Sequence, residues 1–251
     1  MPNPNKISSL TQISSGQITI AGHDIDLLIR EFSFSQVSWL LLTGQIPDQK
    51  QARMLEAMLV SCVDHGINAP STSVARAVAS CGVPIQSAIS AGIAAIGEHH
   101  GGAGEACARI LQKAIKEHPT TATEDIAQMI VLEYSGNNKR IPGFGHRVHT
   151  SDPRTISLFR LARELDLVGQ HVNLILAIES ILCEAKGKKI PINVDGAIAA
   201  ILSDLGLGWH LSKTIFIISR TVGLSAHVNE EMMAGKPLEA FRRLGRESST
   251  E

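Results

Sequence analysis

The sequence predicts an all-α fold. Apolar side chains recur every three or four residues through most of the 251 positions, which is the spacing of amphipathic helices. Glycine and proline interrupt these stretches and mark connections between helices. Only residues 17–25 alternate weakly between apolar and polar side chains, so we expect one short hairpin there and no βαβ pattern elsewhere.

The first quarter of the chain predicts short helices after an irregular start. We expect residues 1–15 to be frayed, Asp24 to cap one helix, and Ser35 to begin another that stops at Gly44. Asp48 then opens the helix with the clearest periodic signal. Its apolar stripe consists of Met54, Leu55, Met58, Leu59, Cys62 and Val63.

Later helices are predicted from the same spacing. Ser71 or Thr72 opens a helix of small residues, and residues 85–97 are apolar on nearly every face. We expect this second segment to be buried, inside the subunit or across a dimer. Asp152 is a good N-cap before Pro153, which suits the first helical position. The remaining predicted helices cover about 105–116, 124–134, 153–166, 171–185, 196–205, 211–231 and 236–246.

Composition limits the class of protein. With 23 basic and 24 acidic residues, the net charge is −1, which does not favour nucleic acid or an anionic membrane as the main partner. No apolar run reaches membrane-spanning length, and residues 1–6 do not resemble a signal peptide. Four widely spaced cysteines predict buried free thiols and a cytoplasmic protein. They are Cys62, Cys81, Cys107 and Cys183.

Residues 141–154 form a bent loop that carries chemistry. Pro142, Gly143 and Gly145 bend the backbone before His146, and Arg154 follows on the first turn of the next helix. A proton-transfer group and a bidentate anion clamp would therefore lie close together. The plainer interpretation, a glycine–proline linker with surface charges, is equally compatible with composition alone.

Other polar residues lie at helix breaks or in apolar helices, and each has a structural alternative. A histidine beside glycine is more often a hydrogen-bonding residue than a catalyst. His99 and His100 are adjacent, so at most one points into a site, and Asp195 could be only an N-cap. Arg220 is more informative, because a buried arginine needs an anion. The candidate set is His65, His99, His100, His146, Arg154, Asp195 and Arg220.

Together these groups suit proton abstraction beside a carbonyl, followed by making or breaking of a carbon–carbon bond. A metal site is the main alternative chemistry, with possible ligands at His99, His100, His146, His149 and Asp195. However, the sequence holds no HExxH or CxxC pair, so we expect no metal. It also lacks a complete dinucleotide fingerprint and a phosphate-binding GxxxxGK[ST] loop.

Six motifs occur in an order that resembles the citrate synthase family, over about residues 15–230. They are Leu40-Leu-Leu-Thr-Gly-Gln-Ile-Pro47, Asp64-His-Gly-Ile-Asn-Ala-Pro-Ser-Thr-Ser73, His100-Gly-Gly-Ala-Gly-Glu105, Pro142-Gly-Phe-Gly-His-Arg-Val148 with Asp152-Pro-Arg154, Asn193-Val-Asp195, and Ser219-Arg-Thr-Val-Gly223 with Ala226-His227. Each motif is weak to moderate alone, and the ordered set is specific.

The resemblance implies a helical bundle with a large domain at 1–103 and 193–251, a small domain at 104–192, and an interdomain cleft. It implies a homodimer or higher homo-oligomer that takes small-molecule substrates, namely an acyl-CoA, oxaloacetate or citryl-CoA. The coenzyme A thioester would be a substrate, with no tightly bound cofactor and no metal.

The resemblance also implies roles for individual residues. His100 would hold the thioester oxygen, Asp195 would move the proton on the acetyl carbon, and His146 would serve the carbonyl or hydroxyl of the other substrate. The dicarboxylate would be bound by His65, Arg154 and Arg220. The backbone of Pro142, Gly143, Phe144 and Gly145 would line the coenzyme A site.

Three features bear on the direction of the reaction. The short chain and the sequence Asn-Val-Asp-Gly196 are more similar to citryl-CoA lyases and to the citrate-synthase-like module of ATP-citrate lyase, whereas His100 follows the synthase pattern. We therefore expect a citryl-CoA lyase, with a citrate or methylcitrate synthase as the alternative and a non-catalytic partner subunit as a third hypothesis. Arg242 or Arg243 stands near the place of a synthase arginine that reaches a partner's site.

Overall fold

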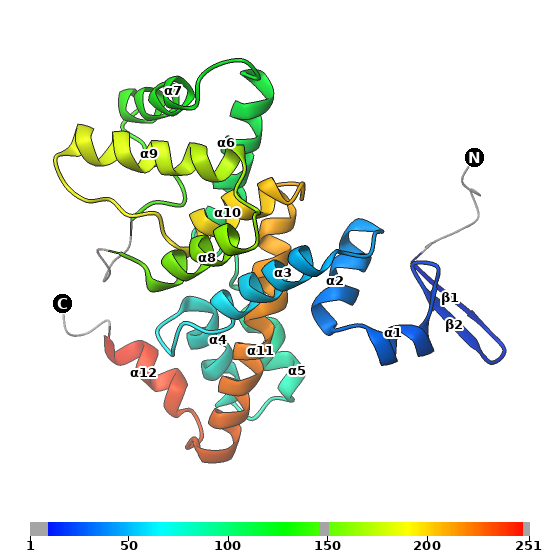
Figure 1. Ribbon diagram of the computed structural model, residues 1–251. Coiled ribbons are helices and arrows are strands. Elements are labelled where there is room, and N and C mark those ends of the chain that lie inside the picture. Colours follow the sequence, from blue (N-terminus) through cyan, green and yellow to red (C-terminus); the bar gives the residue numbers. More distant parts are fainter. Residues whose placement is uncertain (1–9, 146–150, 248–251) are drawn as a thin grey trace. The chain divides into compact units, whose positions relative to one another are not determined.

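The structure is a computed structural model that describes residues 10–145 and 151–247 (Figure 1). Within these residues it contains twelve helices and one small antiparallel sheet, so the all-α prediction is confirmed. The chain divides into two compact units, Met1–Ala57 and Met58–Glu251. No helix in the described ranges is long and apolar enough to cross a membrane.

The first unit begins with a three-stranded sheet in the order β1-β2-β3. Its strands are β1 (Thr11–Ser14), β2 (Gln17–Ile20) and β3 (His23–Asp24). Thr11 pairs with Ile20, and Ile20 pairs with His23. The expectation that residues 1–15 are irregular is wrong for β1. Gly16, with φ of 72°, makes a two-residue turn that pairs this segment with β2.

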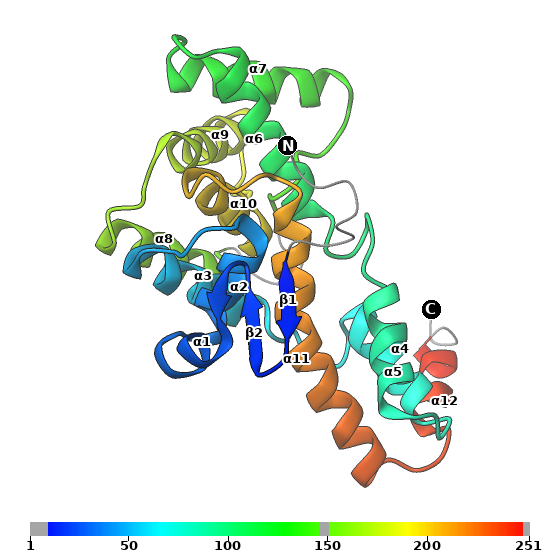
Figure 2. The same ribbon diagram turned by 90° about the vertical axis from the view of Figure 1, so that its right-hand side faces the viewer.

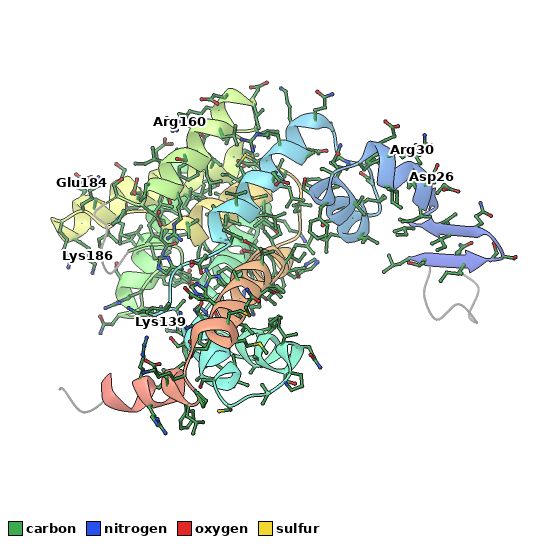
Figure 3. All side chains as sticks on the ribbon, turned by 90° about the horizontal axis from the view of Figure 1, so that it is seen from below. Asp26, Arg30, Lys139, Arg160, Glu184 and Lys186 are labelled. Atoms are coloured by element: carbon green, nitrogen blue, oxygen red, sulfur yellow. The ribbon has the colours of Figure 1, made fainter. Side chains whose placement is uncertain are left out.

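Helices α1 (Ile25–Glu31) and α2 (Phe34–Thr43) follow the sheet. Asp24 caps α1, as predicted, by accepting the N–H of Asp26, and Asp26 forms an exposed pair with Arg30 one turn later (Figure 3). Gly44, at φ 77°, ends α2 in the left-handed conformation. Helix α3 (Gln49–Cys62) starts at the predicted place and continues into the second unit.

One group of helices in the second unit surrounds the long helix α11 (Leu211–Ala234). Helices α4 (Pro70–Ala79) and α5 (Ile85–Ala94) pack against α11, and α12 (Glu239–Glu247) packs against α4. Figure 2 shows α4 and α5 beside the C-terminal half of α11. Their shared core consists of Ala75, Ala79, Ala88, Leu224 and Val228. Helix α4 begins one residue earlier than expected, because Pro70 occupies its first position.

Helix α5 is buried on one face within this chain, and its predicted burial across a dimer stays a prediction for the other face. Only Ala88 and Gly92 are buried in this chain, and the exposed face includes Ile85. Gly92 lies so close to α4 that a Cβ there would stand 2.8 Å from the Ser71 carbonyl oxygen and 2.9 Å from Cβ of Ala75. Small residues therefore allow close packing on one face, while the other stays open to solvent.

The second group of helices surrounds α10 (Val194–Asp204), whose residues 196–203 are all buried. It consists of α6 (Ala103–Glu117), α7 (Thr123–Gly136), α8 (Pro153–Glu164) and α9 (Gln170–Lys186). Helices α6, α8 and α9 pack directly against α10 (Figure 1). Glu184 and Lys186 extend from the exposed last turn of α9 (Figure 3).

Asp204 joins two helices of this group. Its carboxylate accepts the backbone N–H groups of Gly169 at 2.8 Å, His171 at 2.9 Å and Val172 at 3.0 Å, which otherwise lack partners at the start of α9. It also lies 2.8 Å from His171 Nδ1. His171 is therefore partly buried in the contact between α9 and α10.

Two further expectations have different outcomes. The four cysteines are free, but Cys81 is exposed and Cys183 is only partly buried, which corrects the prediction that all are buried. The predicted large domain (1–103 and 193–251) and small domain (104–192) are not tested by the division at residues 57 and 58. They stay a prediction.

Candidate active site

The predicted site residues converge on one pocket of about 150 Å³ in the second unit. Five of the six predicted catalytic and substrate-binding side chains line it. His146, the sixth, lies outside the described residues. The lining residues are Cys62, His65, His100, Gly101, Arg154, Asn193, Val194, Asp195, Phe216 and Arg220.

His100 is held in one tautomer by the start of α4. The backbone N–H of Ser71 donates to His100 Nε2 at 3.3 Å, and Ser71 Oγ lies 2.8 Å from the same nitrogen. Because a nitrogen that accepts an N–H carries no proton, the ring proton resides on Nδ1. Burial, followed by the positive charge of Arg220 and His65, lowers the pKa of His100. His100 is therefore a neutral imidazole with one N–H to donate.

Arg154 is paired within its own turn. Asp152 is the N-cap of α8, as predicted, and is only 1% exposed. Its carboxylate accepts Arg154 Nε at 3.0 Å and Nη2 at 2.8 Å, and it also accepts the Val194 N–H at 3.2 Å. Burial alone would raise the pKa of Asp152, but these hydrogen bonds outweigh it and lower the pKa. Arg154 is thus fixed against the start of α10.

Arg220 is buried without a full set of partners. It is 2% exposed, its Nε donates to the Cys62 carbonyl at 3.1 Å, and its guanidinium lies 4.9 Å from the ring centre of Phe216. Its Nη1 has no hydrogen-bond partner among the described residues. Burial lowers the pKa of this arginine. Since an unpaired buried donor is costly, the geometry indicates an anionic ligand at this nitrogen.

Asp195 lies on the first turn of α10, and it is not the N-cap. Asn193 takes that place, with its side chain accepting the Gly196 N–H at 3.1 Å, so the alternative of Asp195 as only a cap is wrong. Burial raises the pKa of Asp195, although the nearby charges of Arg154 and Arg220 oppose this. Among the described residues, none donates a hydrogen bond to its carboxylate. The group therefore holds a proton more readily than an ordinary aspartate and can act as a proton carrier.

The segment from Pro142 to Gly145 is pinned beside the pocket and does not line it. Gly145 N–H donates to the Pro191 carbonyl at 2.7 Å, and Asn193 N–H donates to the Gly143 carbonyl at 3.0 Å. Gly143 has a φ of 87°, and a Cβ there would meet Cys107 Sγ at 2.8 Å. Glycine is therefore required at this position for both conformation and space.

Other sites receive less support. No cluster of three or more metal-ligating side chains occurs in the described ranges, although two of the candidate ligands, His146 and His149, fall outside them. His99 is exposed and does not line the pocket. A larger pocket of about 390 Å³ between α6 and α7 contains none of the predicted site residues.

Sequence reasoning missed three contributors to the site. Asp152 was recognised only as a cap, although it also orients Arg154. Ser71 was recognised only as a helix start, although it orients His100. Cys62 was placed in an apolar stripe, and it lines the pocket with a thiol whose pKa burial raises to about 11. A polar residue at a helix start beside a candidate site residue is the signal that could have found Asp152, whereas Ser71 lies 29 positions from His100.

Chemically, the pocket joins two guanidinium groups to a neutral imidazole donor and a carboxylate of raised pKa. Such a site can hold a dianion, stabilise a developing oxyanion and move a proton to or from carbon.

The family model for "Citrate synthase, C-terminal domain" matches residues 47–244, which is most of the chain. The chain belongs to the citrate synthase family. The resemblance recognised from the six motifs is therefore confirmed.

Citrate synthase family members of known sequence support the same conclusion. The citrate synthase of Heyndrickxia coagulans is 31% identical over 209 residues, covering 81% of this chain and 53% of that protein. A citrate/2-methylcitrate synthase of Bacillus subtilis is 30% identical over 211 residues, covering 82% and 54%. The chain spans about half the length of these curated relatives.

Solved structures of the citrate synthase family share this fold. The citryl-CoA lyase of Hydrogenobacter thermophilus is 42% identical, with a TM-score of 0.86, and the match covers 92% of this chain and 89% of that one. An ATP citrate lyase from Methanothrix soehngenii, solved with citrate and coenzyme A, has a TM-score of 0.80. It is 24% identical, and the match covers 95% of this chain and 40% of that one. The second likeness concerns the fold alone.

Proposed function

We propose that this chain cleaves citryl-CoA, or a close analogue, to acetyl-CoA and oxaloacetate. The observation that carries the proposal is the buried Arg220, whose Nη1 is unpartnered within the described residues and which lies in a pocket with Arg154, His100 and Asp195. Citryl-CoA combines two free carboxylates with a thioester, so its anionic part fits the arginines. The 42% identity to a citryl-CoA lyase, over most of both chains, favours the lyase direction.

Binding of the dicarboxylate part falls to His65, Arg154 and Arg220. Arg220 supplies its unpartnered Nη1, and Asp152 already fixes the plane of the Arg154 guanidinium. A substrate carboxylate would therefore meet donors that are ordered before binding, which lowers the entropic cost of association.

Cleavage breaks the bond between the acetyl carbon and the carbinol carbon of citryl-CoA. His146, which lies outside the described residues, takes the hydroxyl proton as the oxaloacetate carbonyl forms. The electron pair of the broken bond moves to the thioester oxygen, and His100 Nδ1–H donates to that oxygen. Asp195 in its protonated form then gives a proton to the acetyl carbon. Burial, which raises the Asp195 pKa, favours this proton-carrying form.

The remaining predictions belong to the same proposal. Coenzyme A would lie along the backbone of Pro142–Gly145, with no metal and no tightly bound cofactor. A homodimer or higher homo-oligomer, with the pocket in a cleft between domains 1–103/193–251 and 104–192, would act in the cytoplasm. The open apolar face of α5 is compatible with contact between copies. Whether Arg242 or Arg243 reaches a partner's site is part of this assembly hypothesis.

The direct test is to incubate the purified protein with citryl-CoA and follow oxaloacetate. Wild-type protein and the His99→Ala variant should release it, because His99 is exposed and outside the pocket. His100→Ala should be slower by about 10²–10³-fold, the usual effect of removing an oxyanion donor. Equal rates for the two histidine variants, or no oxaloacetate from wild type, would reject the proposal.

A citrate or methylcitrate synthase is the second candidate, and the synthases among the relatives favour it. Free thiol release from acetyl-CoA or propionyl-CoA with oxaloacetate, in the absence of citryl-CoA, would identify this activity. A non-catalytic partner subunit, the third hypothesis, should bind no coenzyme A in calorimetry and should co-purify with an obligatory partner.

A further inference from the structure

Three residues on one face of α11 contact three consecutive residues of the segment that leads to His65. Positions Arg220, Gly223 and His227 are three and four residues apart, so they share one face of the helix. Arg220 Nε donates at 3.1 Å to the carbonyl of the last residue of α3, and a Cβ at Gly223 would collide with the next carbonyl along the chain. His227 Nε2 lies 2.9 Å from a carboxylate oxygen of the residue after that. Their partners are consecutive, namely Cys62, Val63 and Asp64.

Asp64 links this helix to the backbone around His65. Its second carboxylate oxygen accepts the Gly66 N–H at 3.1 Å, and the His65 N–H also contributes a hydrogen bond. Burial acts to raise the pKa of Asp64, but the hydrogen bonds from Gly66, His227 and His65 outweigh it and lower the pKa. Asp64 is therefore a carboxylate at neutral pH. It accepts hydrogen bonds from Gly66 in its own turn and from His227 on α11.

His227 is itself fixed from the other side. Its Nδ1 lies 3.7 Å from Glu230, which together with the buried Glu231 holds Arg76 of α4 at 3.1 and 2.7 Å. The imidazole thus lies between two carboxylates, those of Asp64 and Glu230. The proposed function gives the Ala226-His227 motif no role, and the structure places its histidine in contact with Asp64 and Glu230.

We propose that His227 is a positioning residue: through Asp64 it holds the loop that presents His65 to the dicarboxylate of the substrate. His227 does not line the pocket and touches no reacting group in this arrangement. The inference rests on the proposed function, because it takes the dicarboxylate as the ligand of His65. Arg220 and His227 both lie on α11, so one helix carries a substrate-binding arginine and also holds the loop of His65.

The test compares His227→Ala with His227→Gln, whose side-chain amide can still donate to Asp64. His227→Ala should raise KM for citryl-CoA by about tenfold with kcat within about threefold, because a binding residue is displaced and the proton-transfer groups are not. His227→Gln should restore most of the wild-type KM. Asn229→Ala, an exposed position on the same helix, is the matched control and should leave both constants unchanged.

A second measurement needs no substrate. Hydrogen exchange at the Gly66 amide should become faster by about tenfold in His227→Ala, and Gln should reverse the change, because the Gly66 N–H donates to the Asp64 carboxylate. This readout separates the two ideas: wild type inactive toward citryl-CoA would reject the proposed function and leave the exchange result standing.

Asp64→Asn covers the case in which His227→Ala does not fold. It should raise KM and speed Gly66 exchange in the same direction, and combining it with His227→Gln should add little to the effect of Asp64→Asn alone. Unchanged KM and unchanged Gly66 exchange in a folded His227→Ala protein would overturn the inference. So would a His227→Gln variant that behaves like His227→Ala.

Discussion

Asp152 and Asp195 lie at the first turns of two helices that pack together, yet their surroundings affect the two carboxylates in opposite ways. Asp152 accepts two hydrogen bonds from the Arg154 guanidinium and one from the Val194 backbone, and its pKa is lowered. Asp195 faces the same arginine without a hydrogen bond from any described residue, and burial raises its pKa.

The difference teaches how one site obtains both a fixed anion and a titrating one. A carboxylate whose hydrogen bonds are satisfied stays charged and holds its partner in place. A desolvated carboxylate that lacks such bonds is held nearer to protonation and can exchange its proton. The structure thus favours Asp152 as a structural anion and Asp195 as the proton carrier, and the following substitutions test this contrast.

The largest effect is expected from Asp195→Asn. It should lower kcat by about 10³-fold, because the amide cannot move a proton. It should not lower the Tm, since it removes a charge that burial disfavours. Steady-state rates with citryl-CoA measure kcat, and calorimetric unfolding measures the Tm. Activity close to wild type would remove Asp195 from the mechanism.

The two arginines should separate stability from binding. Arg154→Met leaves Asp152 buried and unpaired and should cost about 3 kcal/mol of unfolding free energy. Arg220→Met keeps the pair of Asp152 with Arg154, so the loss of unfolding free energy should be less than half as large. Oxaloacetate binding should fall by at least tenfold. Urea unfolding and calorimetric titration of both variants measure this. Equal losses of stability would contradict the comparison.

A smaller effect concerns pH. Asp152→Asn should lower the unfolding free energy at pH 7 by about 2 kcal/mol, the scale of a charge-assisted hydrogen bond. Because the folded-state pKa of Asp152 is depressed, its stabilisation is present above the unfolded pKa of about 3.9 and is lost as the pH falls through the folded value. The gap between wild type and variant should therefore shrink below about pH 4. A gap that is constant from pH 7 to pH 3 would argue against an ionised Asp152.

Local sequence signals predicted much of the fold. The stripe from Met54 to Cys62 gave α3, Asp152 and Pro153 gave the start of α8, and Gly44 gave the end of α2, because caps and periodicity depend on nearby residues. β1 was missed because its partner strand determines its structure. The small side chains of α5 indicated close packing, and the structure shows it on one face, whereas burial across a dimer stays a prediction.

Five residues that line the pocket could be named from the sequence, but their geometry could not. The ordered motifs identified His65, His100, Arg154, Asp195 and Arg220, which the structure brings around one pocket. No local pattern could show that Asp152 also binds the Val194 amide, or that His227 reaches Asp64 across 163 positions of sequence. Such contacts depend on how distant helices pack.

The tautomer of His100 rests on a main-chain donor, and this has a consequence for mutational robustness. Substituting Ser71 by alanine deletes a hydroxyl but keeps the peptide N–H at 3.3 Å from Nε2, so the imidazole proton should remain on the opposite nitrogen. Among single replacements at this position, proline is the one that removes that donor. The position of the proton on the His100 ring therefore depends on a backbone N–H, which most substitutions of Ser71 would not remove.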